Sequence, residues 1–140
     1  MSIKKISSYC SATSTRQPNR GYLFTYGTLM CPELMQQICG HTFKQPFGGT
    51  LKGFQRHQLK MRHYPGIRAR RGKQTQGVLY PVTVPDLKKL DHYEGREYIR
   101  QTVTVATRSG SMQAWCYVLK KEYAELLLPQ DWHDFTFCQA

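Results

Sequence analysis

The stretch VPDLKKLDHYEG, residues 84–95, decides the fold together with the two stretches that follow it, YIRQTVTVAT at 98–107 and MQAWCYVLK at 112–120. Pro85 suits the first turn of a helix and Gly95 suits its end, so residues 84–95 predict a helix. The next two stretches alternate apolar and polar residues on either side of RSGS, which predicts a long β-hairpin. A helix that leads into antiparallel strands indicates an α+β domain.

Three stretches upstream have the composition of strands. GYLFTYG at 21–27 is apolar and ends in a glycine turn, and QGVLYPV at 76–82 reaches its end or a sheet edge at Pro81. FGGTLKGFQRHQLKM at 47–61 carries glycines that indicate bends or bulges. Between the last two strands, HYPGIRARRGK at 63–73 predicts a Pro-Gly turn followed by a basic loop.

Two more short helices complete the predicted domain. CPELMQQICG at 31–40 has a small N-cap residue, a proline in the first turn and a closing glycine, and its spacing turns Leu34 and Ile38 toward the core. A further short helix is predicted within residues 121–135, KEYAELLLPQDWHDF. Two aromatic residues near the end of this stretch are expected to cover the core: Trp132 and Phe135. Strands dominate, which predicts a small mixed, mostly antiparallel β-barrel with short helices.

The chain length of 140 residues suits one domain, which we place at residues 21–140. The first 20 residues are polar, lack acidic side chains and contain no apolar segment of the kind found in secretory signals. We expect a disordered extension there, and Arg16 and Arg20 leave an organellar transit peptide as the alternative. No apolar run is long enough to cross a bilayer.

The net charge of +11 is concentrated in the middle of the chain. No acidic residue occurs between Glu33 and Asp86, and residues 44–73 contain nine lysines and arginines. This excess can serve solubility, attract a small anion into a cleft, or bind nucleic acid, and we prefer the three in that order. The basic residues alternate with apolar positions, apart from the cluster RARR at 68–71.

The five cysteines form an odd set with irregular spacing and no CxxC pair. This pattern argues against a disulfide framework or a zinc ribbon, and it favours a reducing compartment, so we expect a cytoplasmic protein. Cys31 stands at a predicted helix start, where a thiolate would be stabilised, but a small N-cap residue is the simpler interpretation. Cys39 and His41 alone are weak grounds for a metal site.

Glu94 occupies an unusual position on the predicted helix. Positions seven apart on a helix nearly coincide, so Glu94 points the same way as Leu87, with Leu90 on the same side. The polar residues of the helix fall on the opposite face: Lys88, Lys89 and His92. The helical spacing therefore predicts a carboxyl group on the face that is turned toward the core.

Burial and the negative end of the helix would both raise the pKa of Glu94, and Asp91 one turn earlier could add repulsion. A carboxyl group shifted in this way is suited to proton transfer near neutral pH. The alternative is a structural ion pair with Arg96, Arg100 or a residue of the basic middle segment, and helical spacing alone favours this alternative.

The loop YGTLM at 26–30 follows the first predicted strand and precedes a helix start. Gly27 permits a tight turn, and backbone N–H groups near a helix start can hold an anion or a developing oxyanion. The loop is not a P-loop, because GxxxxGK[ST] is absent from the chain.

FTYGTLM at 24–30, taken together with LDHYEGREYIR at 90–100, resembles the gamma-glutamylcyclotransferase-like family, which includes avirulence-induced plant proteins and gamma-glutamylamine cyclotransferases. The resemblance covers about residues 21–135, and three intermediate stretches agree with it: GFQRHQLKMRHYPGI, GVLYPV and AWCYV. It implies the small barrel fold of that family. CPELM after the loop differs from several amine-specific members, so the resemblance does not carry over a particular substrate.

The resemblance also implies a function. It assigns Glu94 as general acid and base, and it places Tyr26, Gly27, Thr28 and Leu29 in the substrate loop, with lesser roles for two residues after the glutamate: Tyr98 and Arg100. The reaction releases 5-oxoproline when the α-amine of a γ-glutamyl substrate attacks its own γ-carbonyl. Because the nucleophile belongs to the substrate, no metal or other cofactor is expected, and the partner is a small γ-glutamyl compound.

Two other functions remain open at this point. The same pocket could bind a small anion without turnover, or the basic segment 44–73 could bind nucleic acid. Within the cyclotransferase interpretation, a basic residue of that segment would attract the substrate carboxylate. The residues specify no oligomeric state.

Overall fold

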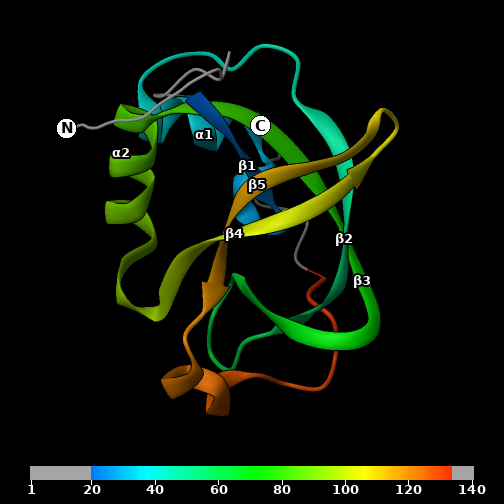
Figure 1. The fold of residues 1–140 in the computed structure, drawn as a ribbon. Helices are drawn as coiled ribbons and strands as arrows, with labels where there is room; N and C mark the ends of the chain where they lie inside the picture. Colours follow the sequence, from blue (N-terminus) through cyan, green and yellow to red (C-terminus); the bar gives the residue numbers. More distant parts are fainter. Residues whose placement is uncertain (1–19, 134–140) are drawn as a thin grey trace, which may run out of the picture.

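The computed structural model describes residues 20–133. Residues 1–19 of the predicted N-terminal extension and Phe135 lie outside this part of the chain, whereas Arg20 belongs to the first strand. Five strands close into a barrel in the order β1-β3-β2-β4-β5 (Figure 1). Neighbouring strands are antiparallel except β1 and β5, which are parallel where Leu23 faces Trp115. The strand bounds are Arg20–Thr25 for β1, Phe47–Gln58 for β2, Pro65–Thr83 for β3, Tyr98–Thr107 for β4 and Gly110–Leu119 for β5. The predicted α+β class and mostly antiparallel barrel are confirmed.

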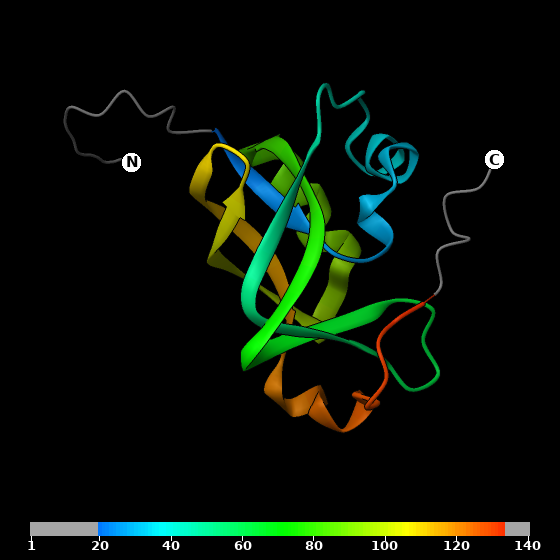
Figure 2. The ribbon, with the colours of Figure 1, turned by 90° about the vertical axis from the view of Figure 1, so that its right-hand side faces the viewer.

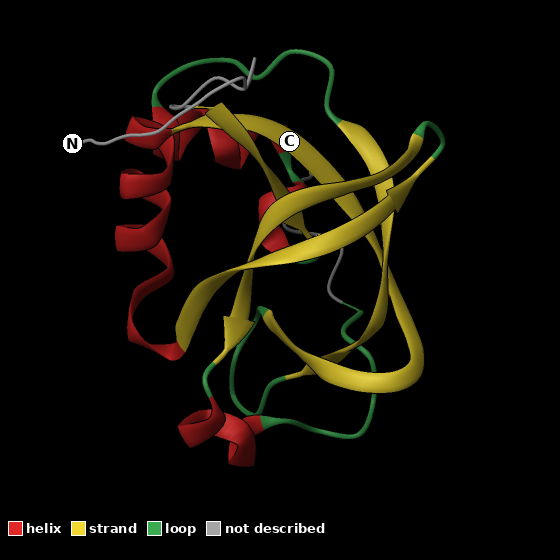
Figure 3. Ribbon diagram, viewed as in Figure 1, coloured by secondary structure: helices red, strands yellow, loops and turns green. Residues whose placement is uncertain are grey.

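The helices lie outside the barrel, and Figure 3 shows α2 along one side of it. Their bounds are Thr28–Met30 for the 3₁₀ turn η1, Pro32–Cys39 for α1, Val84–Glu94 for α2, Gly95–Glu97 for the 3₁₀ turn η2 and Lys121–Leu126 for the 3₁₀ helix η3. All three predicted helices are present, although the last is a 3₁₀ helix.

A capping box fixes the start of α2. The Asp86 amide donates to the Thr83 hydroxyl at 3.3 Å, and the Thr83 amide donates to the Asp86 carboxylate at 3.0 Å. Leu87 and Leu90 are buried, whereas the lysines between them are exposed, as the helical spacing predicted. Gly95 ends the helix with a positive φ of 75°, a backbone conformation that glycine adopts without a steric cost. The end of α2 is therefore fixed at Glu94.

Helix α1 turns a different face to the core than the spacing predicted. Met35 and Cys39 are fully buried, and Leu34 and Ile38 are only partly buried against the same cluster. The apolar side chains occupy adjacent positions on the helix, so the sequence defines a broad apolar face but not its centre. The packing of α1 against α2 and the barrel selects the centre.

Strand β3 runs through the segment that was predicted as a basic loop, so that prediction is wrong. Residues 65–69 pair with the second half of β2, and residues 74–79 pair with its first half. The register shifts between Lys52 and Phe54, at Gly53 with a φ of 82°, which confirms a bulge at a glycine. The β2–β3 ribbon curves strongly at this point (Figure 2). The ribbon leaves residues 68–74 exposed on both faces, and its polar pattern therefore resembles that of a loop.

Successive residues of β1 point to two hydrophobic clusters on opposite sides of the strand. Leu23 packs in the cluster below α1 and α2, whereas Phe24 packs in the cluster that contains Leu51, Leu79 and Val105. Trp132 is fully buried and donates from its indole nitrogen to the His63 carbonyl at 2.8 Å, which confirms that it covers the core. Strand β1 is thus held rigidly on both faces where it leads into the 26–30 loop.

Candidate functional site

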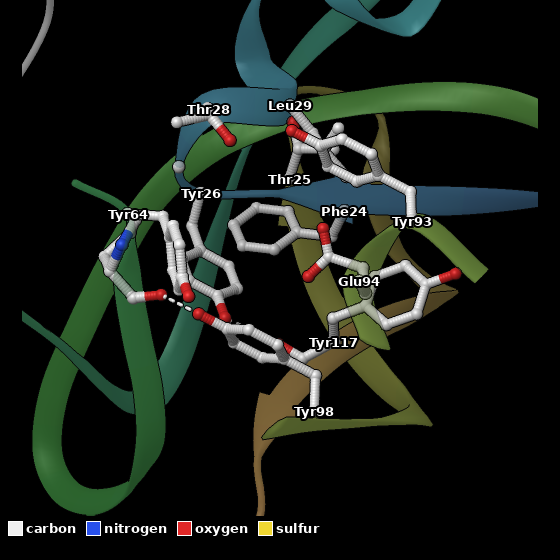
Figure 4. Close-up of a pocket in the computed structure, with 12 residues that line it drawn as sticks. Phe24, Thr25, Tyr26, Thr28, Leu29, Tyr64, Tyr93, Glu94, Tyr98 and Tyr117 are labelled. Carbon is white, nitrogen blue, oxygen red and sulfur yellow. Dashed lines mark hydrogen bonds between the residues drawn. The ribbon is translucent and has the colours of Figure 1, made fainter. Parts of the chain in front are cut away.

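A cavity of about 270 Å³ opens beside the carboxyl end of β1. Figure 4 shows its lining, which comes from β1, the following turn, the start of β3, the end of α2, β4 and β5. All the predicted catalytic and substrate-binding residues line it, and they come from two segments far apart in the chain: Tyr26, Gly27, Thr28, Leu29, Glu94 and Tyr98. The 26–30 loop and Glu94 therefore line the same cavity.

The Glu94 carboxylate points into this cavity (Figure 4). Among the described residues, none donates a hydrogen bond to it or forms an ion pair with it. Burial among aromatic side chains raises the pKa of Glu94 from 4.5 to about 7. Part of its surface stays open to the cavity, so the carboxyl group is both strongly desolvated and accessible to a ligand.

Asp91 was expected to raise the pKa of Glu94 by repulsion, but it is paired with other residues. Its carboxylate accepts from the Arg100 guanidinium at 2.8 Å and from the Tyr117 hydroxyl at 2.7 Å. Burial tends to raise the pKa of Asp91, but these hydrogen bonds outweigh it and the pKa is lowered. Arg100 also lies over the Trp115 ring at 4.2 Å. The predicted ion pair between Glu94 and Arg100 is therefore wrong, and burial is the cause of the shift at Glu94.

Contacts from the barrel hold the 26–30 loop in place. The Arg56 guanidinium donates to the Tyr26 carbonyl at 3.0 Å and pairs with Asp131 at 2.8 Å. The Tyr26 hydroxyl donates to the Tyr117 carbonyl at 2.6 Å. The Met30 amide donates to the Gly27 carbonyl at 3.0 Å, which closes the turn of η1. The amide groups at the start of such a turn have no partner within it.

Gly27 is tightly packed in this loop. A Cβ atom at this position would lie 2.7 Å from the Cγ and Cδ atoms of Pro65, which is closer than side-chain carbons approach one another. The Pro65 carbonyl in turn accepts a hydrogen bond of 2.6 Å from the buried Tyr98 hydroxyl. One line of contacts therefore joins the loop, the start of β3 and the start of β4.

Tyr98→Phe tests the last of these contacts. The change leaves the buried Pro65 carbonyl without its side-chain donor, so we expect the free energy of unfolding to fall by about 1–2 kcal/mol. Urea denaturation measures it. Tyr22→Phe is the matched control, since no described residue forms a hydrogen bond with the hydroxyl of this partly exposed side chain, and it should change stability by less than about 0.5 kcal/mol. Equal effects of the two substitutions would contradict the role given to the Tyr98 hydroxyl.

Glu94 is the only Asp, Glu, Lys, Arg or His among the described residues that line the cavity. The expected basic residue from the middle segment is not found there, which corrects the prediction that this segment provides the substrate carboxylate with a partner. Five tyrosines surround the glutamate instead: Tyr26, Tyr64, Tyr93, Tyr98 and Tyr117. Burial raises the pKa of each, so their hydroxyl groups remain protonated at neutral pH.

Sequence reasoning missed Tyr93 and Tyr117, and it left Tyr64 undecided between the pocket and a plain turn. Tyr64 lines the cavity and donates to Glu97 at 3.0 Å, and Arg62 pairs with the same carboxylate at 2.8 Å. Tyr93 precedes Glu94 on α2, so its position next to the predicted catalytic residue could have identified it as a cavity residue. Tyr117 carried no comparable signal, because its position depends on the closure of the barrel.

The described residues test the cysteine expectations only in part. Cys39 and Cys116 are buried free thiols, and the cytoplasmic location stays a prediction. Within residues 20–133, no three His, Cys, Asp or Glu side chains gather in a group that could hold a metal ion. None of the helices in this part of the chain has the length and apolar character needed to span a bilayer.

Comparison with known proteins places the chain among relatives of the same fold. AIG2-like protein A of Arabidopsis thaliana is 36% identical over 103 residues, which are 73% of this chain and 60% of that protein. AIG2-like protein C is 37% identical over 71% of this chain and 59% of its own length. The chain thus spans about 60% of the length of these curated relatives.

Solved structures agree on the fold. The solution structure of an Arabidopsis thaliana protein superimposes with a TM-score of 0.71 at 26% identity, over 84% of this chain and 81% of that one. A structure described as a gamma-glutamyl cyclotransferase gives a TM-score of 0.64 at 19% identity, over 72% of this chain and 67% of that one. An AIG2-like protein from Mus musculus also gives 0.64 at 19% identity, over 83% and 87%.

A family model provides the remaining evidence. Residues 23–134, which include the cavity and its loop, match the model described as gamma-glutamyl cyclotransferase, AIG2-like. This match covers most of the chain and agrees with the curated relatives, so the chain belongs to the gamma-glutamyl cyclotransferase, AIG2-like family.

Proposed function

We propose that this protein is a gamma-glutamyl cyclotransferase that releases 5-oxoproline from a γ-glutamyl amine or γ-glutamyl amino acid, with Glu94 as the general acid and base. The observation that carries the proposal is the Glu94 carboxyl group, which lies in a tyrosine-lined cavity with a pKa of about 7 and no ion-pair partner among the described residues. A group of this kind exchanges protons readily near neutral pH.

The first step needs a base. The substrate enters with its α-ammonium group near Glu94, where the carboxylate and the faces and hydroxyls of the tyrosines favour a cation. Glu94 removes one proton, and the freed amine nitrogen attacks the substrate's own γ-carbonyl carbon. The α-ammonium group of a γ-glutamyl substrate has a higher pKa than Glu94, and raising the pKa of Glu94 to about 7 narrows that gap relative to an ordinary glutamate.

The second step returns the proton. The attack forms a five-membered ring with an oxyanion and a cationic ring nitrogen, and the protonated Glu94 gives its proton to the departing nitrogen as the carbon–nitrogen bond to the leaving amine breaks. The ring nitrogen then passes its extra proton to the leaving amine, which departs as an ammonium ion, so Glu94 ends as the carboxylate that it was at the start. The products are 5-oxoproline and a free amine, so no group remains on the enzyme. A single carboxyl group thus acts as base and then as acid.

The loop 26–30 supports the other requirements of this reaction. Gly27, Thr28 and Leu29 line the cavity, where their backbone N–H groups could donate to the oxyanion or to the substrate carboxylate. The five tyrosine side chains define a narrow space that would fold the γ-glutamyl chain toward a near-attack geometry. The enzyme therefore needs to position one flexible substrate and to move one proton.

A product assay tests the proposal. The purified chain is incubated with a panel of γ-glutamyl amines, γ-glutamyl amino acids and glutathione, and 5-oxoproline is measured by mass spectrometry. We expect release from at least one member of the panel, with an equal amount of free amine. A folded protein that binds a panel member in the cavity but releases no 5-oxoproline would overturn the proposal.

The non-catalytic alternative is less well supported. A pocket that senses small anions would gain affinity from a cation, yet the described lining offers none and includes a carboxyl group. Nucleic-acid binding through residues 44–73 remains a prediction. It requires tight binding to DNA or RNA that weakens steeply with salt, and filter binding across a salt series measures this directly.

A further inference from the structure

A second cavity, of about 440 Å³, lies between the β2–β3 ribbon and the segment that follows η3. Hydrogen bonds hold that segment along β2, where the Leu128 amide donates to the Gln58 carbonyl and the Gln58 amide donates to the Gln130 carbonyl, both at 2.9 Å. Figure 2 shows η3 and the chain after it beside this end of the ribbon. The cavity shares no lining residue with the one that contains Glu94.

The charge of the second cavity is the opposite of that of the first. Its lining includes Arg68, Arg70 and Lys73, and it includes no acidic residue of the described chain. The described ion pairs involve none of these three cations. Gln55 and Arg68 face each other in the register of the ribbon, so the β-pleat itself directs their side chains to one side.

His57 is one of the residues that line this cavity. It is only 3% exposed, and its Nδ1 atom lies 2.7 Å from the Leu128 carbonyl oxygen. Because a carbonyl oxygen can only accept, Nδ1 carries the hydrogen, and Nε2 of the neutral ring is left as an acceptor. Nε2 has no hydrogen-bond partner, nor does the buried Oε1 atom of Gln55. Two buried acceptors without donors in a cavity rimmed by cations indicate a ligand that both donates and accepts.

We propose that this cavity binds the phosphate group of a small phosphorylated molecule. The phosphate binds as its monoanion, whose protonated oxygen donates to Nε2 of His57, and the unprotonated oxygens accept from the two guanidinium groups and from Lys73. A hydroxyl group on the rest of the ligand satisfies Oε1 of Gln55. The volume lies within the range of small-molecule sites, about 300–1,000 Å³, so there is room beyond the phosphate itself.

Three anions test the donated hydrogen bond to His57 and the organic part of the ligand separately. Each is titrated into the wild-type chain, and binding is followed by calorimetry and by the imidazole NMR signals of His57. The probes are glucose 6-phosphate, inorganic phosphate and sulfate. The titrations are run near pH 6, where about half of a phosphate monoester retains one proton. Sulfate has the shape of phosphate but carries no proton at this pH, so it should bind at least about fivefold more weakly, since it places an unprotonated oxygen against the Nε2 lone pair. Tighter binding of glucose 6-phosphate than of phosphate identifies an organic phosphate, and equal binding identifies free phosphate.

A pair of arginine variants locates the site. Arg70 lines the cavity and Arg71 does not, yet both are exposed and both remove one positive charge when changed to alanine. Arg70→Ala should weaken phosphate binding about tenfold, the loss of one charge-assisted hydrogen bond, and Arg71→Ala should weaken it less than about twofold. Glu94→Gln should leave phosphate binding unchanged, which keeps this test separate from that of the cyclotransferase.

Four results would overturn the proposal. They are equal losses in the two arginine variants, equal binding of sulfate and phosphate, imidazole signals of His57 that do not respond to phosphate, and binding that is seen only with long DNA or RNA. The first and last would show that the basic surface acts through its overall charge.

Discussion

Glu94→Gln is expected to lower the rate of 5-oxoproline release by about 10²–10⁴-fold, the usual contribution of a general acid and base. Glutamine has the size and shape of the glutamate but cannot take up a proton, so the substrate should still bind while its ammonium group stays protonated. The loss should therefore appear in kcat, with KM changed little. Steady-state kinetics with the best substrate of the panel measures both constants.

Glu125→Gln provides the control for this experiment. Glu125 is exposed on η3 and lines neither cavity, so the change removes a carboxylate without touching the proposed chemistry. Its kcat should match that of the wild type. A Glu94→Gln variant that retained wild-type kcat would exclude Glu94 as the proton carrier.

The same substitution should raise stability near neutral pH. The pKa of Glu94 is about 7 in the fold and 4.5 as its ordinary value, so the folded state disfavours the carboxylate. This cost is absent below about pH 4.5, grows as the pH rises to about 7, and is constant above it, reaching on the order of 3 kcal/mol. Glutamine never ionises and does not incur it.

Urea denaturation at pH 4 and pH 8 measures this difference. Glu94→Gln and the wild type should be equally stable at pH 4, and the variant should be more stable by about 1–3 kcal/mol at pH 8. A variant that is less stable at pH 8 would instead point to a structural ion pair of Glu94. In the wild type, kcat/KM should rise with pH through the same range near 7, since the free enzyme must hold Glu94 as the carboxylate to accept a proton.

The helix that carries Glu94 could be predicted because its determinants are local. Pro85 and Gly95 mark its ends, and the seven-residue spacing from Leu87 to Glu94 sets the direction of the carboxyl group whatever the rest of the chain does. The hairpin β4–β5 is equally local, since its two strands alternate around a short turn. These two elements already place Glu94 at the point where α2 meets the barrel.

Other features depend on contacts between distant residues, and sequence spacing does not encode them. Arg56 holds the 26–30 loop through the Tyr26 carbonyl, 30 residues away, and nothing in the basic segment singles out Arg56 among its neighbours. The pairing of Arg100 with Asp91 crosses from β4 to α2, so it could not be distinguished from a pairing with Glu94. The basic half of β3 is exposed on both faces over residues 68–74, so no buried apolar residue there marks the two-residue alternation of a strand.

Gly27→Ala should lower cyclotransferase turnover by about 100-fold, because it displaces the loop that borders the proposed reaction centre. The added methyl group would lie 2.7 Å from two ring carbons of Pro65, and the proline is buried and joined to Tyr98 through a 2.6 Å hydrogen bond. The proline has little freedom to move, so the loop must shift instead. A shift of about 1 Å in groups that position a substrate is enough for such a loss.

Gly48→Ala is the matched control for that substitution. Gly48 lies in β2, and the heavy atom nearest to a Cβ there is the Gly77 carbonyl oxygen at 3.9 Å, an ordinary contact. Its turnover should stay within about twofold of the wild type.

For Gly27→Ala, urea denaturation should show a folded protein at the assay temperature, so that lost turnover reports on the loop. Because Glu94 belongs to α2 and not to the loop, Gly27→Ala should retain the rise in kcat/KM near pH 7 while the maximum falls. A variant with full turnover would mean that the loop amides lie outside the reaction centre, whereas a fall in rate with a shifted pH profile would mean that the loop also sets the surroundings of Glu94.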